Sequence, residues 1–279
     1  MPAHLTDNGD HTETAYDRLG RVATTTDQRG VVHTYIYDSA GRVWKDLATA
    51  PSGWGDVDNS VQAIFTTYDD TGRVEFVTSY ADTSGTTAVN QIKYEYGDWG
   101  NLVKENQEHD GVVDQYTPYV EYGYDDGASG SVAKYVRLTQ VTYPNGRSVG
   151  YDYAAGVDDV MSRVSSIFDD ADADGILDGG EDIYASYKYL GAGTIVEEDY
   201  DDIAVKLSYL DSNGDITGFD RFGRIVEQIW TDYGANPDEI LDHYSYTYDR
   251  AGNRLSKSNE LNAAFDEIYG YDNLDRLAS

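Results

Sequence analysis

Residues 170–181 carry acidic side chains at a spacing that could hold a cation. Asp170, Asp172 and Asp174 occupy alternate positions, and Gly175 follows them directly. Carboxylates held this close repel one another unless a cation offsets their charge. Several carboxylate oxygens in one short loop are the donors that calcium prefers. The segment therefore predicts a calcium site.

The spacing of these residues resembles the calcium loop of EF-hand proteins, D-x-D-x-D-G-x₅-E, and matches it at every defined position. The resemblance implies these oxygen ligands: the side chains of Asp170, Asp172 and Asp174, the carbonyl of Ile176, Asp178 directly or through water, and bidentate Glu181. The flanking residues 163–168 and 183–187 alternate like strands, so we expect a calcium-stapled hairpin tip at about residues 169–182. The alternative is an acidic, solvated loop without metal.

The rest of the chain is organised by a recurring string. It reads Tyr-Asp, then a glycine three residues after the aspartate, then a basic and an aliphatic residue. Copies start at Tyr16, Tyr37, Tyr68 and Tyr248, and looser copies start at Tyr96, Phe219 and Tyr271. A unit that returns every 20 to 50 residues or so indicates an array of one supersecondary element.

Each unit is predicted to be a β-hairpin, because tyrosines alternate before the string and would form a stripe on one strand face. The aspartate and glycine fit a type I turn closed by a left-handed glycine. We therefore expect positive φ at Gly20, Gly41, Gly72, Gly223 and Gly252. The arginine after the turn can cover a neighbouring tyrosine ring or pair with an acidic neighbour. Cross-strand packing is the favoured role of the tyrosines, and a ligand-stacking surface is the alternative.

The string covers the chain from Tyr16 to Leu277 and resembles the YD-repeat (Rhs-repeat) family. That family occurs in Rhs and wall-associated polymorphic toxins, in the C components of Tc toxins and in teneurins, as hairpin strips wound into a hollow shell. The resemblance implies an all-β fold of tandem antiparallel β-hairpin repeats in a curved, spiralling sheet, part of a YD-repeat shell. We expect a polar lead-in at residues 1–15 and the repeat array, with the calcium loop inserted, at residues 16–279.

The charge and composition of the chain exclude some classes of binding partner. The formal net charge is −31, with 51 acidic against 20 basic residues, which argues against nucleic acid and anionic membrane surfaces. The chain has no cysteine and no apolar stretch of about 18 residues, so no membrane insertion is expected and any export signal lies outside this segment. With the family resemblance, these features indicate an extracellular or cell-surface protein.

The expected function is a non-enzymatic structural segment of an exported protein, enclosing or presenting other domains. No nucleophile elbow, phosphate loop or histidine metal spacing is present in the sequence. The alternative is an adhesin that stacks glycans on tyrosine and tryptophan stripes, including Trp44, Trp54, Trp99 and Trp230. The expected partners are neighbouring repeats or copies of the chain, and a C-terminal toxin or a glycan. Open strand edges near Tyr16 and Leu277 predict end-to-end association into a filament.

Overall fold

The computed structural model describes residues 11–51, 58–127, 133 and 135–278. It divides into two units, the first formed by Met1–Tyr122 with Tyr143–Asn145, and the second by Gly123–Thr142 with Gly146–Ser279. In both units nearly every element is a β-strand, so the prediction of an all-β chain of antiparallel hairpins is confirmed. Trp54 and most of the predicted lead-in lie outside the described residues.

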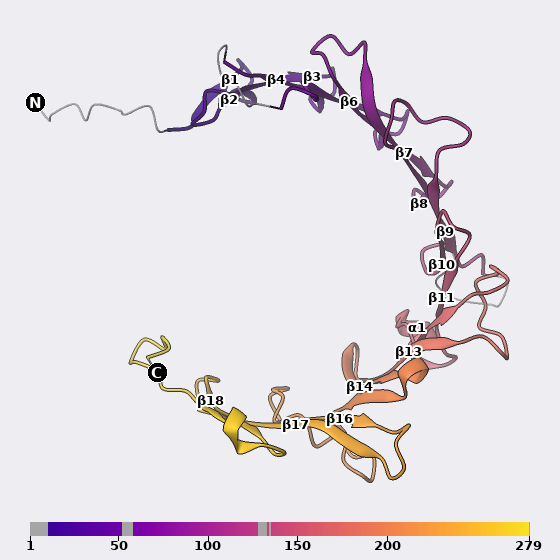
Figure 1. Ribbon diagram of the computed structural model, residues 1–279, viewed down its shortest axis with the longest axis vertical. Coiled ribbons are helices and arrows are strands. Elements are labelled where there is room, and N and C mark those ends of the chain that lie inside the picture. The colour runs from indigo at the N-terminus through magenta and orange to yellow at the C-terminus, as the bar shows by residue number, and fades with distance from the viewer. Residues whose placement is uncertain (1–10, 52–57, 128–132, 134, 279) are drawn as a thin grey trace, which may run out of the picture. The chain divides into compact units, whose positions relative to one another are not determined.

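In the first unit each strand pairs antiparallel with the next strand along the chain, from indigo to magenta in Figure 1. The strands are β1 (Glu13–Tyr16), β2 (Val22–Thr26), β3 (Val32–Tyr37), β4 (Val43–Thr49), β5 (Ala63–Tyr68), β6 (Val74–Tyr80), β7 (Ala88–Tyr96), β8 (Leu102–Glu108) and β9 (Tyr119–Tyr124), whose last two residues belong to the second unit. Strand β1 begins at Glu13, so strand structure reaches into the segment expected to be a polar lead-in.

The second unit continues the same antiparallel succession with short helical insertions. Its strands are β10 (Leu138–Thr142), β11 (Ser148–Asp152), β12 (Ser166–Asp169), β13 (Ile183–Leu190), β14 (Thr194–Tyr200), β15 (Val205–Ser208), β16 (Glu227–Asp232), β17 (Glu239–Tyr248), β18 (Arg254–Asn259) and β19 (Glu267–Ile268). Its helices are α1 (Val157–Met161), η1 (Asp201–Ile203) and η2 (Ala263–Phe265). No helix among the described residues has the length and apolar character needed to span a membrane.

The turn of each repeat has the geometry that its sequence predicts. In the first copy the amide of Gly20 donates to the carbonyl of Asp17 at 3.0 Å, and the amide of Asp17 donates to the carbonyl of Arg21 at 2.8 Å. Gly20, Gly41, Gly72, Gly223 and Gly252 have φ of 78°, 83°, 91°, 75° and 97°, so the prediction of positive φ is confirmed. These turns need glycine because a side chain disfavours this left-handed region.

A β-bulge lies next to the turn in six of these hairpins. In β3–β4, Tyr37 pairs with Val43 but the preceding Ile36 pairs with Lys45, so Trp44 is the extra residue. The same shift occurs at Tyr16, Tyr68, Tyr96, Tyr189 and Tyr248. A bulge bends its strand and increases the local twist. The repeat therefore fixes a local distortion of the sheet as well as a turn.

Buried apolar side chains gather in the second unit, on β10 to β15. Phe168 on β12 is fully buried, and it packs against β11 at Gly150. A Cβ atom at Gly150 would lie 2.0 Å from the Cζ atom of Phe168. Gly150 therefore has to be glycine for close approach of the aromatic ring. In the first unit Ala63 is the one buried apolar residue among those the structure describes.

Candidate functional site

The predicted calcium loop connects β12 to β13, and these two strands pair antiparallel. The amide of Asp169 donates to the carbonyl of Asp182 at 2.9 Å and closes the hairpin directly below the loop. The flanks are therefore strands, as the sequence predicted, and the loop is a hairpin tip.

Three of the six predicted ligands come together at this tip. Asp170, Asp172 and Asp174 each offer a carboxylate oxygen within 4.8 Å of the others. Asp170 is only 1% exposed, whereas Asp172 and Asp174 face solvent. Partial removal from water, and then the neighbouring carboxylate of Asp174, raise the pKa of Asp172 above its usual value. A cation among these oxygens would offset that repulsion.

The buried carboxylate of Asp170 is held by the strands beneath the loop. Its Oδ2 accepts hydrogen bonds from Gln140 Nε2 at 2.6 Å and from Ser148 Oγ at 3.1 Å. The amides of Asp174 and Gly175 donate to the same carboxylate, each at 3.1 Å. These bonds fix the first residue of the loop in place and curl the chain around it.

The other three predicted ligands, Ile176, Asp178 and Glu181, are not part of this carboxylate cluster. The carboxylate of Glu181 accepts hydrogen bonds from the amides of Ala171 at 3.0 Å and Asp178 at 2.9 Å, so it braces the loop. Ile176 donates its amide to Asp174 Oδ1 at 2.8 Å, and its side chain is exposed. The three-carboxylate cluster fits a hard divalent cation, and Glu181 would have to exchange its amide partners to join it.

A second recurring arrangement links each hairpin to the next, and we call it the inter-hairpin lock. The guanidinium of Arg42 pairs with Asp38 of its own turn at 2.7 Å and lies 3.8 Å from the centre of the Tyr68 ring in the following hairpin. The hydroxyl of Tyr68 donates to the carbonyl of Val43 at 2.8 Å. One tyrosine therefore makes both a cation–π contact and a hydrogen bond to the hairpin before it.

The lock returns in both units with the same parts. Its arginine–tyrosine pairs are Arg21–Tyr37, Arg42–Tyr68 and Arg73–Tyr96 in the first unit, and Arg137–Tyr153, Arg163–Tyr189 and Arg224–Tyr248 in the second. In each pair the tyrosine hydroxyl donates to the carbonyl of the residue after the arginine, at 2.6 to 2.9 Å. In the last copy Asn253 takes the place of the arginine and bonds to Asp249, while Tyr271 still donates to the carbonyl of Arg254.

Sequence reasoning missed two of these locks because their turns are lengthened. Eleven residues separate Arg137 from Asp125, where a regular turn such as Asp17–Arg21 has three, and the amide of Asp125 still donates to the carbonyl of Arg137. Arg163 follows Tyr153 after an insertion that contains α1. The available signal was the arginine–aliphatic pair at Arg137 and again at Arg163, each placed before a strand.

The tryptophans that the alternative hypothesis assigned to glycan stacking are spread over different elements. Trp44 is on β4 beside Phe65, with ring centres 6.2 Å apart, and its side chain is 41% exposed. Trp99 is in the turn between β7 and β8 and is 70% exposed. In the second unit Trp230 is stacked on Tyr200 at 6.3 Å. The described tryptophans therefore form separate contacts and not one continuous stripe.

Comparison with known proteins agrees with this arrangement. Residues 16–53 match the sequence model of the RHS Repeat family. A crystal structure of TcdB2-TccC3 is similar over 95% of this chain, with 18% identity and a TM-score of 0.60. The Tc holotoxin pore of Photorhabdus luminescens is similar over 95% of it, with 17% identity and a TM-score of 0.65. No curated protein matches the chain.

The chain spans only 12% to 13% of the length of these solved structures. At this identity the likeness concerns the fold, and the repeat match supplies the sequence evidence. The predicted resemblance to the YD-repeat family is confirmed: residues 16–53 match the RHS repeat, within a succession of hairpins that has the fold of the Tc toxin structures.

Proposed function

We propose that the chain is a non-enzymatic structural segment of a larger exported protein, forming part of a β-shell or fibre that encloses or presents other domains. The observation that carries this proposal is the inter-hairpin lock. Basic residues number only 20 against 51 acidic residues, and the lock takes up six of them, all arginines, between neighbouring hairpins. A repeat array of this kind is stabilised by contacts between neighbours and not by one central core.

The comparisons support the wider setting of this segment. Proteins with the same fold are components of Tc toxin assemblies and are roughly eight times longer than this chain, so we infer further repeats and further domains around it. The same likeness supports an extracellular or cell-surface location. Neighbouring repeats, copies of this chain or a toxin component are the partners that such a segment would meet.

Association of the purified chain tests this structural role. Exposed side chains lie at both outer strands, including Tyr16 at 64% and Ile268 at 83%, where another strand could pair. We expect light scattering to show growth from low to physiological salt, because salt screens the repulsion of a chain with charge −31. Electron microscopy should show that growth proceeds end to end. A monomer at every salt and calcium concentration would refute the fibre role and leave a self-capped segment.

We further propose that the hairpin tip at Asp170, Asp172 and Asp174 binds calcium and is ordered by it. Calorimetry should record binding heat at or below about millimolar calcium, the weak end of the range for extracellular sites. Asp172→Asn should weaken binding by about tenfold or more, because it removes one carboxylate of the cluster. Asp215→Asn, in an exposed acidic turn outside the cluster, is the matched control. Absence of heat, or equal loss in both variants, would reject the site.

Glu181→Ala separates two roles of that carboxylate. The variant should bind calcium more weakly, because it removes two candidate oxygen ligands as well as the bonds to Ala171 and Asp178. Glu181→Gln keeps one carbonyl oxygen and can still brace the loop, so it should retain part of the affinity. Unchanged binding in both variants would assign the site to the three aspartates alone.

A further inference from the structure

A cavity of about 580 Å³ lies in the second unit, and we call it the tip cavity. Three strands contribute to its lining, with Tyr124 at the end of β9, Thr139 on β10 and Tyr151 on β11. Residues 174–177 of the hairpin tip line it as well. The tip lies close to β10, because a Cβ atom at Gly175 would be 3.3 Å from Thr139 Oγ1. The volume is in the range of small-molecule sites.

The lining of the tip cavity carries an excess of negative charge. One arginine, Arg137, faces five aspartates there: Asp125, Asp126, Asp152, Asp159 and Asp174. Arg137 Nη1 lies 2.7 Å from Asp159 and 3.8 Å from Asp125, so it is shared by these two carboxylates. A recess lined by charges of one sign concentrates the electrostatic field and attracts ions of the opposite sign.

Two of these carboxylates have no cationic partner among the residues that the structure describes. Asp152 Oδ2 accepts a hydrogen bond from Ser165 Oγ at 2.8 Å, and Asp174 Oδ1 accepts one from the amide of Ile176 at 2.8 Å. Both partners are neutral, so neither carboxylate has its charge offset. The tip cavity therefore offers Asp152 and Asp174 to a cation from outside the chain.

Arg137 adds an independent sign of a ligand, because one of its donors is unused. Its side chain is 4% exposed, and its guanidinium lies 4.4 Å from the centre of the Tyr153 ring. Nη1 donates to Asp159 and Nη2 donates to Ser162 Oγ at 3.3 Å, but the buried Nε has no hydrogen-bond partner. A buried donor without an acceptor is unfavourable. Since Arg137, Asp159 and Tyr153 all line the cavity, a ligand there lies beside this donor.

We propose that the tip cavity binds a basic amino acid, with its cationic side chain between Asp152 and Asp174 and its carboxylate at Arg137 Nε. A guanidinium or ammonium group offers only donors, and a carboxylate offers only acceptors. The two halves of such a ligand therefore match the two unsatisfied parts of the lining. The rings of Tyr124 and Tyr151 add aromatic walls, which favour a cation.

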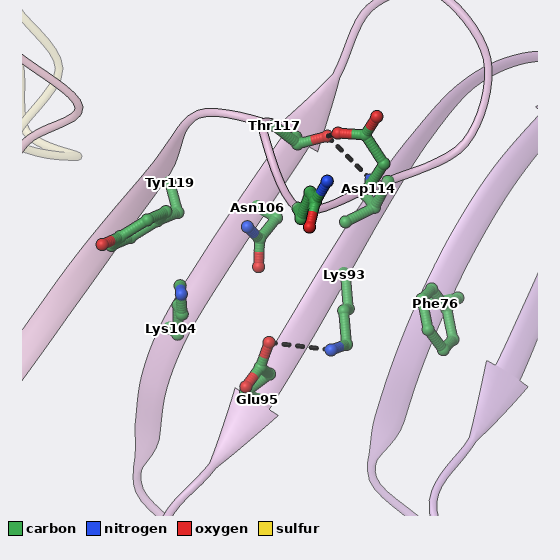
Figure 2. Close-up of a pocket in the computed structure, with 10 residues that line it drawn as sticks. Phe76, Lys93, Glu95, Lys104, Asn106, Asp114, Thr117 and Tyr119 are labelled. Atoms are coloured by element: carbon green, nitrogen blue, oxygen red, sulfur yellow. Dashed lines mark hydrogen bonds and ion pairs between the residues drawn. The ribbon is translucent and has the colours of Figure 1, made fainter.

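A smaller hollow in the first unit lacks this charge excess. It has a volume of about 360 Å³ and lies beneath the loop between β8 and β9, at Asn106. Two lysines balance two acidic residues in its lining, which are Lys93, Lys104, Glu95 and Asp114. Figure 2 shows Lys93 beside Glu95, and these two side chains are 2.8 Å apart. The hollow therefore serves as an internal control for cation binding.

The test is titration of the whole isotope-labelled chain with L-arginine, up to about 50 mM at low salt, followed by NMR. A chelator keeps calcium away, because Asp174 also belongs to the three-carboxylate cluster. We expect a saturable shift of the Arg137 Nε–H signal and no shift of the Asn106 side-chain amide. Agmatine lacks the carboxylate and citrulline lacks the side-chain charge, so each should bind about tenfold more weakly than L-arginine.

Variants of the lining test the role of the carboxylates. Asp152→Asn should weaken L-arginine binding about tenfold, and it keeps a side-chain oxygen for Ser165. Asp126→Asn changes an exposed lining residue and should also weaken binding without threatening the fold. Asp215→Asn removes the same charge outside the cavity and should leave binding unchanged.

Four results would overturn the proposal. They are absence of a saturable shift at Arg137, equal binding of citrulline and L-arginine, equal loss in Asp152→Asn and Asp215→Asn, and tighter binding of the peptide Gly-Gly-Arg than of L-arginine. The last result would assign the cavity to the end of a polypeptide, which carries the same two groups. None of these results bears on calcium binding or on end-to-end association, so the proposed structural role is tested separately.

Discussion

The regular hairpins of the first unit and the lengthened hairpins of the second unit build the same lock with different carboxylates. In the regular turn, Arg21 Nε and Nη2 both reach Asp17 of the same turn at 2.7 Å. In the lengthened hairpins the carboxylates come from α1: Asp159 pairs with Arg137 at 2.7 Å, and Asp158 pairs with Arg163. One short helix therefore serves two consecutive locks.

The difference shows which parts of the repeat are essential. Tyrosine, arginine and the following aliphatic residue keep their contacts in both kinds of hairpin, while the turn between them varies in length. Longer loops add little entropic cost, so the insertion itself is tolerated. The lengthened hairpins instead lose a hydrogen bond at the arginine. The Nε atoms of Arg137 and Arg163 are buried without a hydrogen-bond partner, whereas in the regular turns the arginine Nε donates to the turn aspartate.

The largest effect is expected at Arg137. Its side chain is 4% exposed, against 34% for Arg42 in a regular lock. Arg137→Met should lower the free energy of unfolding by about 3 kcal/mol or more, because it removes a buried cation and leaves Asp125, which is 10% exposed, without it. Arg42→Met should cost only about 1 kcal/mol at its half-exposed site. Urea unfolding of both variants checks the order, and a larger loss for Arg42→Met would contradict the comparison.

Acidification should destabilise the fold by protonating the aspartates of the regular turns. Hydrogen bonds from the backbone amides of Arg21 and Arg42, assisted by their guanidinium groups, hold the pKa values of Asp17 and Asp38 below 3.8. A lowered folded-state pKa contributes stability above the unfolded value, and that stability is lost as pH falls from 3.8 through the folded pKa. The urea midpoint should therefore drop in this acid range.

The Asp38→Asn variant is the control for this acid effect, because protonation also relieves repulsion among 51 acidic residues. The variant should be less stable at neutral pH and should lose less stability on acidification than the natural chain. Identical acid profiles for the two proteins would show that the turn carboxylate does not contribute.

A glycine pair separates the turn from the lock. Gly20 and Gly72 both have positive φ, so alanine at either should cost about 1 kcal/mol. A Cβ at Gly72 would also lie 3.0 Å from Arg42 Nη1, and nothing lies within 4 Å at Gly20. Gly72→Ala should therefore destabilise more than Gly20→Ala, by a few tenths of a kcal/mol to about 1 kcal/mol. If both variants lost the same stability in thermal unfolding, the Arg42 side chain would move aside for the new methyl group at no cost.

The smallest single effect is expected from removing one tyrosine hydroxyl. Tyr68→Phe keeps the ring beneath Arg42 but removes the bond to the carbonyl of Val43. The loss should be about 1 kcal/mol, as for an ordinary hydrogen bond. Tyr16→Phe is the control, because Tyr16 is 64% exposed and lies on the outer strand β1. If Tyr16→Phe lowered the free energy of unfolding as much as Tyr68→Phe, the hydrogen bond of the lock would not be the cause of the loss.

Local sequence signals predicted the regular part of the fold. The aspartate–glycine spacing gave the turns, and the alternating tyrosines gave the strands, because both depend on residues close in sequence. The partners of Arg137 and Arg163 could not be predicted, since Asp159 and Asp158 reach them from an inserted helix. The same holds for Gly150 under Phe168 and for Asn106 beneath its loop, which depend on contacts between strands. At the hairpin tip, spacing identified the three aspartates that converge, but the bracing bonds of Glu181 needed three-dimensional geometry.

A double-mutant cycle between Arg42 and Tyr68 tests the central claim, that each hairpin is held to the next by the lock. The variants are Arg42→Met, Tyr68→Ala and their combination, and the matched cycle pairs Arg42 with Tyr96, whose ring is covered by Arg73. We predict a coupling free energy of about 1 kcal/mol between Arg42 and Tyr68. Between Arg42 and Tyr96 the two losses should add, to within about 0.5 kcal/mol. Additive losses in the Arg42–Tyr68 cycle would contradict the account.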